Sequence, residues 1–276
     1  MFEAGLLDGK RILVTGGGTG LGKAMARRMS ALGASLVLCG RREQVLKEAA
    51  AEISTETGGA VDAVPCDIRD AGAVSALFDA AGRIDVLVNN AAANFIAETH
   101  KLSPRALDTL FAINMNGPMY CTVEAGRRWI EAGQRGGVIL SILSTAVVTG
   151  RAFTVPAIMG KAGMLAMTRS LAVEWGRYGI RTVAIGPGPF PTPGAWSRLR
   201  PGKRADGEGP ERHNPAGRVG EHIELANLAC YLISDQASYI SGQLVAIDGG
   251  AMFRSSGAED LLGWSAADWE AVRPKK

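Results

Sequence analysis

Several features that would direct a chain to a membrane, to nucleic acid or to a disulfide-built fold are missing. The 276 residues include only four cysteines, which are scattered and form no CxxC pair or other metal-ligand spacing. The apolar runs fall well short of the length that spans a bilayer. The net charge is only +3, with acids and bases interspersed, so nothing favours a nucleic-acid partner. We therefore expect a cytoplasmic protein with reduced thiols, no metal site and no membrane segment.

Targeting signals are also missing at both ends of the sequence. The stretch Met1–Lys10 carries acids and no long apolar run, unlike a secretory signal. The final Pro274-Lys275-Lys276 is not a peroxisomal tripeptide. No stretch resembles a linker between two cores, and 47% of the residues are apolar, enough for a sizeable core. We predict a single domain over residues 1–276.

Glycine, in contrast, is abundant, and one cluster of it stands in an informative context. The stretch from Thr15 to Gly22 follows an apolar run at 11–14 and precedes residues with helical spacing. A glycine-rich turn between strand and helix lets a pyrophosphate approach the bare amides of the helix N-terminus. We predict a dinucleotide site here, with a turn that binds nothing as the alternative. Its expected contacts are Gly16, Gly17, Gly18, Thr19, Gly20 and Leu21.

Strand and helix signals alternate along the chain. Apolar runs predict strands at 35–39, 61–66, 84–88, 138–141 and 243–248, and helical spacing predicts helices at 43–57, 71–81 and 157–175. This rhythm predicts an α/β fold, a Rossmann-type doubly wound parallel sheet in a single domain. In such a sheet the ligand binds at the carboxyl ends of the strands.

Residues at three predicted strand ends suit a dinucleotide. Arg41 and Arg42 follow the second strand with no acid before them. Arginine there suits the 2′-phosphate of NADP, whereas an acid would bind the ribose of NAD, so we predict NADP(H); a solvated helix start is the alternative. Asp67, after the third strand, could accept a hydrogen bond from the adenine amine. Asn89 and the small residue Ala91, after the fourth, would let the cofactor's ribose lie against the backbone.

The pattern resembles the short-chain dehydrogenase/reductase family over residues 8–252. The stretches that carry the resemblance are Thr15 to Gly22, Asn89 to Ala92 and Asp248-Gly249-Gly250. The resemblance implies that Asn114, in the helix that Ser103 and Pro104 open, bends that helix and holds a proton-relay water. It also implies a tetramer, with which the small, apolar helix at 157–175 agrees.

The family's catalytic serine and lysine have counterparts, but its tyrosine does not. Ser144 and Lys161 match the serine and lysine, whereas Ala157 stands four residues before the lysine, where the family has tyrosine. No tyrosine lies between Ser144 and Lys161. General acid–base catalysis is typically worth about 10²–10⁴-fold, so ordinary alcohol–ketone chemistry is disfavoured. Reduction of a C=C bond conjugated to a thioester depends less on that tyrosine. Hydride adds to the far carbon of the alkene, and the negative charge that collects on the thioester oxygen can be stabilised by hydrogen-bond donors.

Within the family the chain is most similar to 2,4-dienoyl-CoA reductase. The resemblance rests on 89–96, 102–104, 171–176, 187–189, 194–199 and 224–229. It implies that Asn94 donates to the thioester oxygen, that Phe95 flanks the acyl chain and that Lys161 holds the nicotinamide ribose. The residues that it implies for the coenzyme A portion are Arg69, Ser103 and Arg198, and those that line the nicotinamide are Pro187, Gly188, Pro189 and Phe190.

The chain departs from that subfamily at two hydroxyl positions, which are Ala146 and Ala157 here. We predict an NADPH-dependent reductase of the conjugated C=C bond of an unsaturated acyl-CoA, with trans-2-enoyl-CoA reduction as a close competitor. The alternatives are a carbonyl reductase or alcohol dehydrogenase with an atypical site, and a non-catalytic NADP-binding member of the family.

Two further segments are predicted outside the core. Residues 190–215, rich in glycine, proline and basic residues, are expected to form a substrate lid, with a disordered insertion as the alternative. The tail 252–276 carries Trp264 and Trp269. Because exposing a tryptophan side chain to water costs free energy, we expect both to pack on the body or on a neighbouring subunit.

Overall fold

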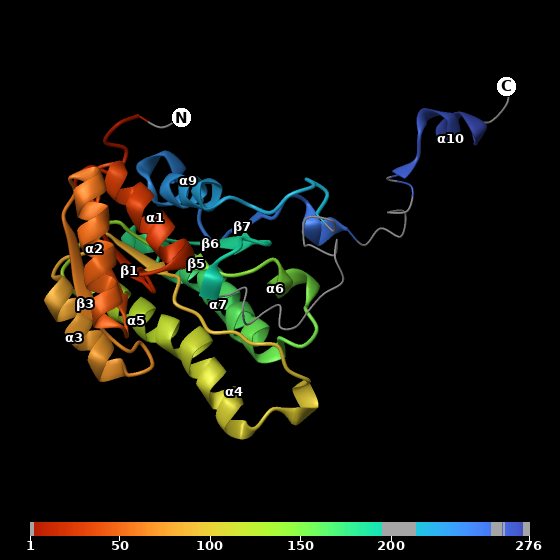
Figure 1. Cartoon of the computed structure of the whole chain (residues 1–276). Coiled ribbons are helices and arrows are strands. Elements are labelled where there is room, and N and C mark those ends of the chain that lie inside the picture. The colour runs from red at the N-terminus through yellow and green to blue at the C-terminus, as the bar shows by residue number, and fades with distance from the viewer. Residues whose placement is uncertain (1–2, 195–213, 255–260, 262, 273–276) are drawn as a thin grey trace.

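A parallel sheet lies at the centre of the molecule. The computed structural model describes residues 3–194, 214–254, 261 and 263–272 (Figure 1). The sheet has seven strands in the order β3-β2-β1-β4-β5-β6-β7, and every neighbouring pair is parallel. The strands are β1 (Arg11–Thr15), β2 (Ser35–Gly40), β3 (Val61–Pro65), β4 (Val86–Asn89), β5 (Gly137–Ile142), β6 (Ile180–Pro187) and β7 (Leu244–Ile247). The predicted doubly wound α/β fold is confirmed.

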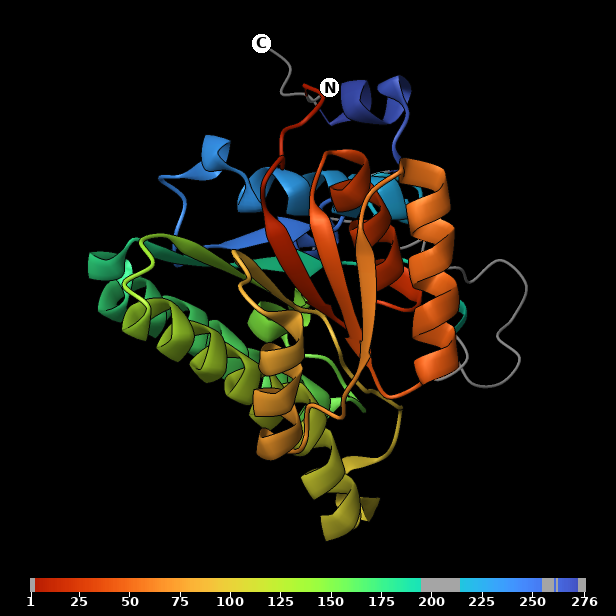
Figure 2. The same ribbon diagram turned by 90° about the vertical axis from the view of Figure 1, so that its left-hand side faces the viewer.

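Helices cover both faces of the sheet (Figure 2). One layer consists of α1 (Gly20–Ala31), α2 (Glu43–Thr57) and α9 (His222–Ile233), and the other of α3 (Ala71–Ala81), α5 (Gly117–Glu131) and α7 (Val155–Glu174). Side chains of β1 alternate between the layers: Ile12 and Val14 join the first core, and Leu13 joins the second. The inner strands β1, β2, β4, β5 and β6 are largely buried and read as continuous apolar runs, which is why they were predictable.

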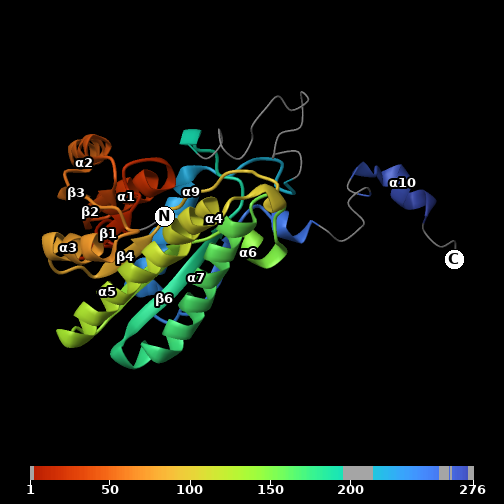
Figure 3. The same ribbon diagram turned by 90° about the horizontal axis from the view of Figure 1, so that it is seen from below.

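A long helical stretch projects beyond the carboxyl edge of the sheet. It starts with α4 (Pro104–Phe111), where Ser103 caps the helix by accepting a hydrogen bond from the Ala106 amide at 3.3 Å. A π-helical turn, η2 (Ala112–Asn116), joins α4 to α5. Figure 3 shows α4 and α5 following one another, with α7 alongside. The shorter elements at this edge are η1 (Thr99–Lys101) and α6 (Ala146–Thr149).

Of the two expected packing partners of the tail tryptophans, the body of this chain is excluded, and a neighbouring subunit stays a prediction. Trp264 and Trp269 pack on each other, with ring centroids 4.9 Å apart, and remain 36% and 47% exposed. The helix α10 (Ala266–Ala271), which carries Trp269, stands apart from the sheet in Figure 1. The two rings therefore do not pack on the body of this chain. Within the described residues no helix is long and apolar enough to cross a membrane. Most of the predicted lid, residues 195–213, lies outside the described part of the chain.

Three short helical turns flank the last two strands: one precedes β6, one precedes β7 and one follows β7. They are η3 (Gly176–Tyr178), η5 (Asp235–Ala237) and η6 (Ala251–Phe253).

Candidate active site

The glycine-rich turn after β1 is fixed to the end of β4 by two polar side chains. The Thr15 hydroxyl donates to the Val88 carbonyl at 3.2 Å and accepts from the amides of Asn90 at 3.0 Å and Ala91 at 3.1 Å. The Asn90 side-chain amide donates to the Thr15 carbonyl at 2.9 Å. These bonds hold the ends of two neighbouring strands together, so the turn has a defined position over the sheet.

The geometry of this turn fits a pyrophosphate. Gly16 has φ +67°, a conformation that favours glycine. A Cβ at Gly22 would lie 2.4 Å from the Gly16 carbonyl oxygen, so only glycine allows the helix to approach the turn this closely. The N-cap residue of α1, Thr19, makes no capping hydrogen bond with its side chain. The first amides of α1 are therefore available to an anion.

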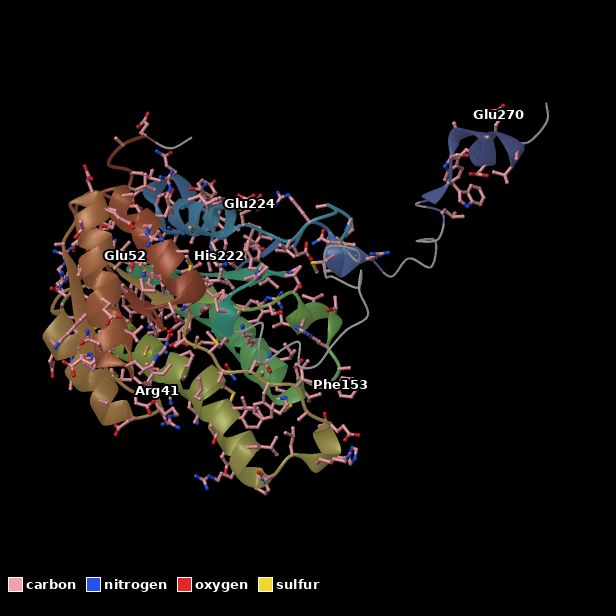
Figure 4. The ribbon with its side chains drawn as sticks, in the orientation of Figure 1. Arg41, Glu52, Phe153, His222, Glu224 and Glu270 are labelled. Carbon is pink, nitrogen blue, oxygen red and sulfur yellow. The ribbon has the colours of Figure 1, made fainter. Side chains whose placement is uncertain are left out.

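Two arginines directly follow β2, at the carboxyl edge of the sheet where the glycine-rich turn also lies. Arg41 and Arg42 are both exposed, and Figure 4 shows Arg41 on the surface of the molecule. Arg42 is the N-cap residue of α2, a position at which serine, threonine or aspartate would cap the helix, and its side chain does not cap. Two cations beside an uncapped helix N-terminus form a local attraction for a phosphate.

Asp67 and Arg69, which were assigned to different ligands, pair with each other. The Arg69 guanidinium donates to both Asp67 carboxylate oxygens, with its Nε 2.9 Å from each. Hydrogen bonds from Arg69 lower the pKa of Asp67 below its usual value. Both residues line a shallow cleft whose other walls are Asp70, Asp108, Thr109 and Ala112. An exposed pair of this kind is worth only about 0–1 kcal/mol, so a ligand can displace either partner.

Asn89 is directed into the protein. It is 1% exposed, and its side-chain amide donates to the Thr122 hydroxyl of α5 at 2.9 Å. The Asn89 side chain thus joins the sheet to α5, and Ala91 and Asn90 are the residues that face the glycine turn.

Lys161 and Ser144 lie at the end of β5. The Lys161 ammonium, near the start of α7, donates to the Leu143 carbonyl at 2.6 Å. Burial lowers the pKa of Lys161 to about 8. The Ser144 hydroxyl accepts from the Ala146 amide at 3.2 Å, and the Thr145 amide donates to the Pro187 carbonyl of β6 at 3.3 Å. The ends of β5 and β6 are thereby held side by side.

The two positions without hydroxyls are filled by buried alanines. Ala146 is 7% exposed and Ala157 is 1% exposed. Neither can donate a hydrogen bond or a proton. Any donor to a reacting oxygen has to come from other side chains near Lys161.

Asn114 holds the loop that carries Asn94. In the π-helical turn, the buried Asn114 accepts from the Ala93 amide at 3.0 Å and donates to the Ala93 carbonyl at 2.8 Å. The next residue is Asn94, and its side-chain Oδ1 is shut off from solvent and has no hydrogen-bond partner among the described residues. Asn94 is therefore held at a fixed place in the site.

The residues expected around the nicotinamide follow β6. The Gly188 amide donates to the Ile247 carbonyl at 3.0 Å, and a Cβ on Gly188 would lie 2.6 Å from the Asp248 Cβ. Phe190 is 7% exposed beneath Gly220. Pro187 is buried and Pro189 half-buried. Arg198 lies outside the described residues.

The parallel sheet brings most of the predicted residues to one edge. The glycine turn, Arg41, Asn94, Ser144 and Lys161 come from segments far apart in the sequence, and all follow strands or flank strand ends. Sequence reasoning gave no role to Thr15, Asn90 and Phe153. A hydroxyl directly at the end of β1 was a usable signal for Thr15; nothing in the sequence marked the backbone of Phe153.

A glycine turn at the switch point of a parallel sheet, with a serine and a lysine at the end of β5, fits a nicotinamide-dependent oxidoreductase. The chain belongs to the short-chain dehydrogenase/reductase family: residues 16–252 match the family model described as enoyl-(acyl carrier protein) reductase.

Similar proteins cover nearly the whole chain. A Caenorhabditis elegans protein described as a probable 2,4-dienoyl-CoA reductase 3, producing (3E)-enoyl-CoA, is 42% identical over 99% of this chain and 91% of its own. A Bacillus subtilis protein described as a probable 2,4-dienoyl-CoA reductase, producing (2E)-enoyl-CoA, is 40% identical over 88% of this chain and 97% of its own. A short chain dehydrogenase structure from Bacillus anthracis has a TM-score of 0.79 and 38% identity, over 89% of this chain and 98% of that one.

Proposed function

We propose that the protein is an NADPH-dependent reductase of the conjugated C=C bond of an unsaturated acyl-CoA. The observation that carries the proposal is the Asn94 amide, anchored through Ala93 and with an unpartnered Oδ1 among the described residues, beside a site whose acid–base position is a buried alanine. The dienoyl-CoA reductase names of the relatives support the same substrate class. The cofactor, when bound, supplies the hydride chemistry.

The chain offers a place for each part of that cofactor. The uncapped start of α1 would hold the pyrophosphate, and Arg41 with Arg42 the 2′-phosphate. Asp67 would accept from the adenine amine when Arg69 is displaced from it. Lys161, already directed to the end of β5, would donate to the nicotinamide ribose.

The remaining polar groups would act on the substrate. In reduction of a conjugated thioester, negative charge collects on the thioester oxygen. The Asn94 amide would donate to that oxygen, with Ser144 in support, and a preorganised donor of this kind stabilises the charge more than water does. The two anchors of Ala93 to Asn114 keep Asn94 in place without reorganisation. Arg69, Ser103 and Arg198 would hold the coenzyme A portion, arginines being suited to its phosphates.

We further propose that the protein forms a tetramer in the cytoplasm. Apolar side chains remain exposed on two neighbouring helices: Met119 and Val123 on α5, and Met159 and Val173 on α7. An apolar surface on adjacent helices suits contact with further copies of the chain.

Oxidation of NADPH, followed by the absorbance of the reduced nicotinamide, tests the function. The substrates are a panel of dienoyl-, enoyl- and ketoacyl-CoA thioesters. We expect turnover of dienoyl thioesters and none of ketoacyl thioesters, and product analysis would place the remaining double bond. Turnover of ketoacyl thioesters alone would favour the carbonyl reductase. NADPH binding without any turnover would favour the non-catalytic alternative.

Cofactor preference has its own test. Arg41→Asp should invert the preference of the protein from NADPH to NADH, because it exchanges a phosphate partner for a partner of the ribose hydroxyls. Arg135→Asp is the matched control, since Arg135 is exposed but precedes β5, at the opposite edge of the sheet. Fluorescence titration of both cofactors is the measurement. Equal affinity of the parent for NADPH and NADH would contradict the assignment.

A further inference from the structure

Phe153 has an unusual backbone. Its φ is +63°, and among the described residues it is the one residue other than glycine with a positive φ. This left-handed region is disfavoured for bulky side chains, whereas glycine adopts it freely. A phenylalanine that stays in this conformation is held there by its surroundings, and such residues gather at functional sites.

Bonds on both sides of Phe153 hold the strained turn. The next residue, Thr154, is 1% exposed, and its hydroxyl donates to the Arg151 carbonyl at 3.3 Å. The Phe153 carbonyl accepts a hydrogen bond from the Ala97 amide at 3.0 Å. The turn between α6 and α7 is thus joined to the loop after β4.

That second bond completes a clamp on the Asn94 loop. The loop is held at Ala93 by Asn114 and at Ala97 by Phe153. Asn94 and Phe95 lie between these two anchors. The backbone of Phe153 therefore helps to position the proposed donor Asn94, although its ring is not needed for that bond.

The Phe153 ring itself is left in solvent. It is 54% exposed, and Phe95, two residues from the amide that bonds to Phe153, is 37% exposed. Figure 4 shows Phe153 at the edge of the molecule. Val148, on α6, adds a third exposed apolar side chain at 59%. The strained backbone thus keeps an aromatic ring exposed beside the loop that carries Asn94.

We propose that the Phe153 ring forms one wall of the channel for the acyl chain, opposite Phe95, and sets which chain lengths the protein accepts. This assignment rests on the proposed function. A hydrocarbon chain is the occupant that suits an apolar ring on a rigid turn continuous with the Asn94 loop, and binding it removes both the ring and the chain from water.

Two substitutions distinguish the contribution of the Phe153 ring from that of its strained backbone. Phe153→Ala removes the ring but keeps a Cβ at positive φ, whereas Phe153→Gly removes the ring and relieves the strain. Both keep the carbonyl that bonds to Ala97. Tyr239→Ala is the matched control, because Tyr239 is a fully exposed aromatic residue before β7, at the other edge of the sheet.

The readout is kcat/KM for dienoyl-CoA substrates of increasing chain length. Each methylene that the ring covers contributes about fourfold in affinity. We expect both Phe153 variants to lose roughly tenfold or more of the long-chain over short-chain preference, with activity on the shortest substrate within a few-fold of the parent. Phe153→Gly should unfold at a higher temperature than Phe153→Ala, and Tyr239→Ala should match the parent. An unchanged chain-length preference in both variants would overturn the proposal.

The experiment distinguishes an error in the proposed reaction from an error in the role of the Phe153 ring. If the parent reduces ketoacyl thioesters instead, the same chain-length series is measured with those, and a loss of preference would still support the channel wall. If the parent turns over neither class of thioester, calorimetry with saturated acyl-CoA thioesters and NADP measures the chain-length preference as a difference in binding affinity. A parent that binds no acyl chain, or a Phe153 variant whose only change is its oligomeric state in size-exclusion chromatography, would contradict the proposal.

Discussion

Buried alanines at 146 and 157 leave few polar groups able to touch a reacting oxygen. Ser144 accepts from the Ala146 amide, which leaves its O–H free to donate, and Lys161 uses one of its three N–H groups on the Leu143 carbonyl. The Asn94 side-chain oxygen Oδ1 has no partner in the described part of the chain and is closed to solvent. An unpaired buried amide oxygen costs free energy in the ligand-free protein, and a donor group of a bound ligand would satisfy it.

Asn94→Ala should lower kcat on a dienoyl-CoA by about 10²–10³, the usual loss for removing one oxyanion donor. Affinity for NADPH should stay within a few-fold, because the cofactor contacts are elsewhere. Single-turnover oxidation of NADPH measures the chemical step directly, and fluorescence titration serves as the control for cofactor binding. A variant as fast as the parent would remove Asn94 from the mechanism.

Lys161 gives the protein a pH-dependent stability. Burial lowers its pKa from 10.5 to about 8 in the folded protein. Between these two values the unfolded chain binds more protons than the folded one, so the free energy of unfolding rises with pH through this window. Below about pH 8 the lysine is charged in both states, and the folded state carries the cost of burying the charge.

Lys161→Met should remove this contribution. Urea unfolding of the ligand-free parent from pH 7 to 10.5 should show stability rising by an amount that the variant lacks. The comparison of slopes is insensitive to the lost bond to Leu143, which shifts stability equally at every pH. Equal slopes for the two proteins would show that Lys161 titrates near its ordinary pKa.

At the residue scale, the sequence predicted which side chains meet but not what each one contacts. Ser144 and Lys161, singled out by their resemblance to the family's serine and lysine, lie together at the end of β5. The pairing of Asp67 with Arg69, and of Asn89 with Thr122, could not be read from the chain. Such choices depend on rotamers and on neighbours that are distant in sequence.

At the scale of elements, local signals were strongest where caps are present. The helices at 43–57 and 71–81 were predicted with the bounds that the structure shows. Gly58 ends the first at φ +74°, and the Asp70 carboxylate caps the second by accepting from the Gly72 and Ala73 amides. The strand β4 starts two residues later than predicted, and Asp85, just before it, accepts from the Arg11 amide at 2.9 Å.

The π-helical turn is the element that local signals could not reveal. Family resemblance implied a bend at Asn114, but the widened turn is set by packing against α7. A Cβ on Gly160 would lie 2.9 Å from the Asn114 Cβ and 3.3 Å from its backbone carbonyl. Gly160 therefore lets α7 approach the turn that positions Asn114 and, through Ala93, Asn94.

Gly160→Ala should destabilise the protein by about 1–3 kcal/mol, the usual cost of overpacking, despite the better helix propensity of alanine. It should also lower kcat, because Asn114 moves. Gly163→Ala is the matched control: its Cβ would meet only the flexible Met115 sulfur at 3.2 Å, so its stability should be equal or higher. Urea unfolding and dienoyl-CoA kinetics measure both effects. A Gly160→Ala protein as stable as Gly163→Ala would contradict the close-packing role.

At the scale of the molecule, the position of the site follows from topology. The strand order reverses between β1 and β4, and ligands of open parallel sheets bind at such a switch point. Thr15 and Asn90 bond the two strands there. The fold and the place of the site were therefore predictable from alternating patterns alone, whereas the fate of the tail, which no periodic pattern governs, was not.

The tail helix α10 is stabilised by contacts within the tail itself. Ser265 and Asp268 cap it reciprocally, and Trp264 packs on Trp269. A helix of six residues has little stability from helix propensity alone, so these local contacts contribute most of its stability. The buried tryptophans of the second core, Trp129 and Trp175, belong to the sheet and its helices.

Deleting residues 255–276 should therefore leave the body of the protein intact. We expect the thermal midpoint to change by less than about 2–4 °C, the shift that corresponds to roughly 1 kcal/mol in a chain of this size. Tryptophan emission should shift to shorter wavelength, because the partly exposed rings of Trp264 and Trp269 are lost while Trp129 and Trp175 remain buried. Dienoyl-CoA kinetics and size-exclusion chromatography complete the comparison. If the truncated chain instead loses subunits or melts well below the parent, the two tryptophans pack on a neighbouring copy, and the tail is part of the assembly.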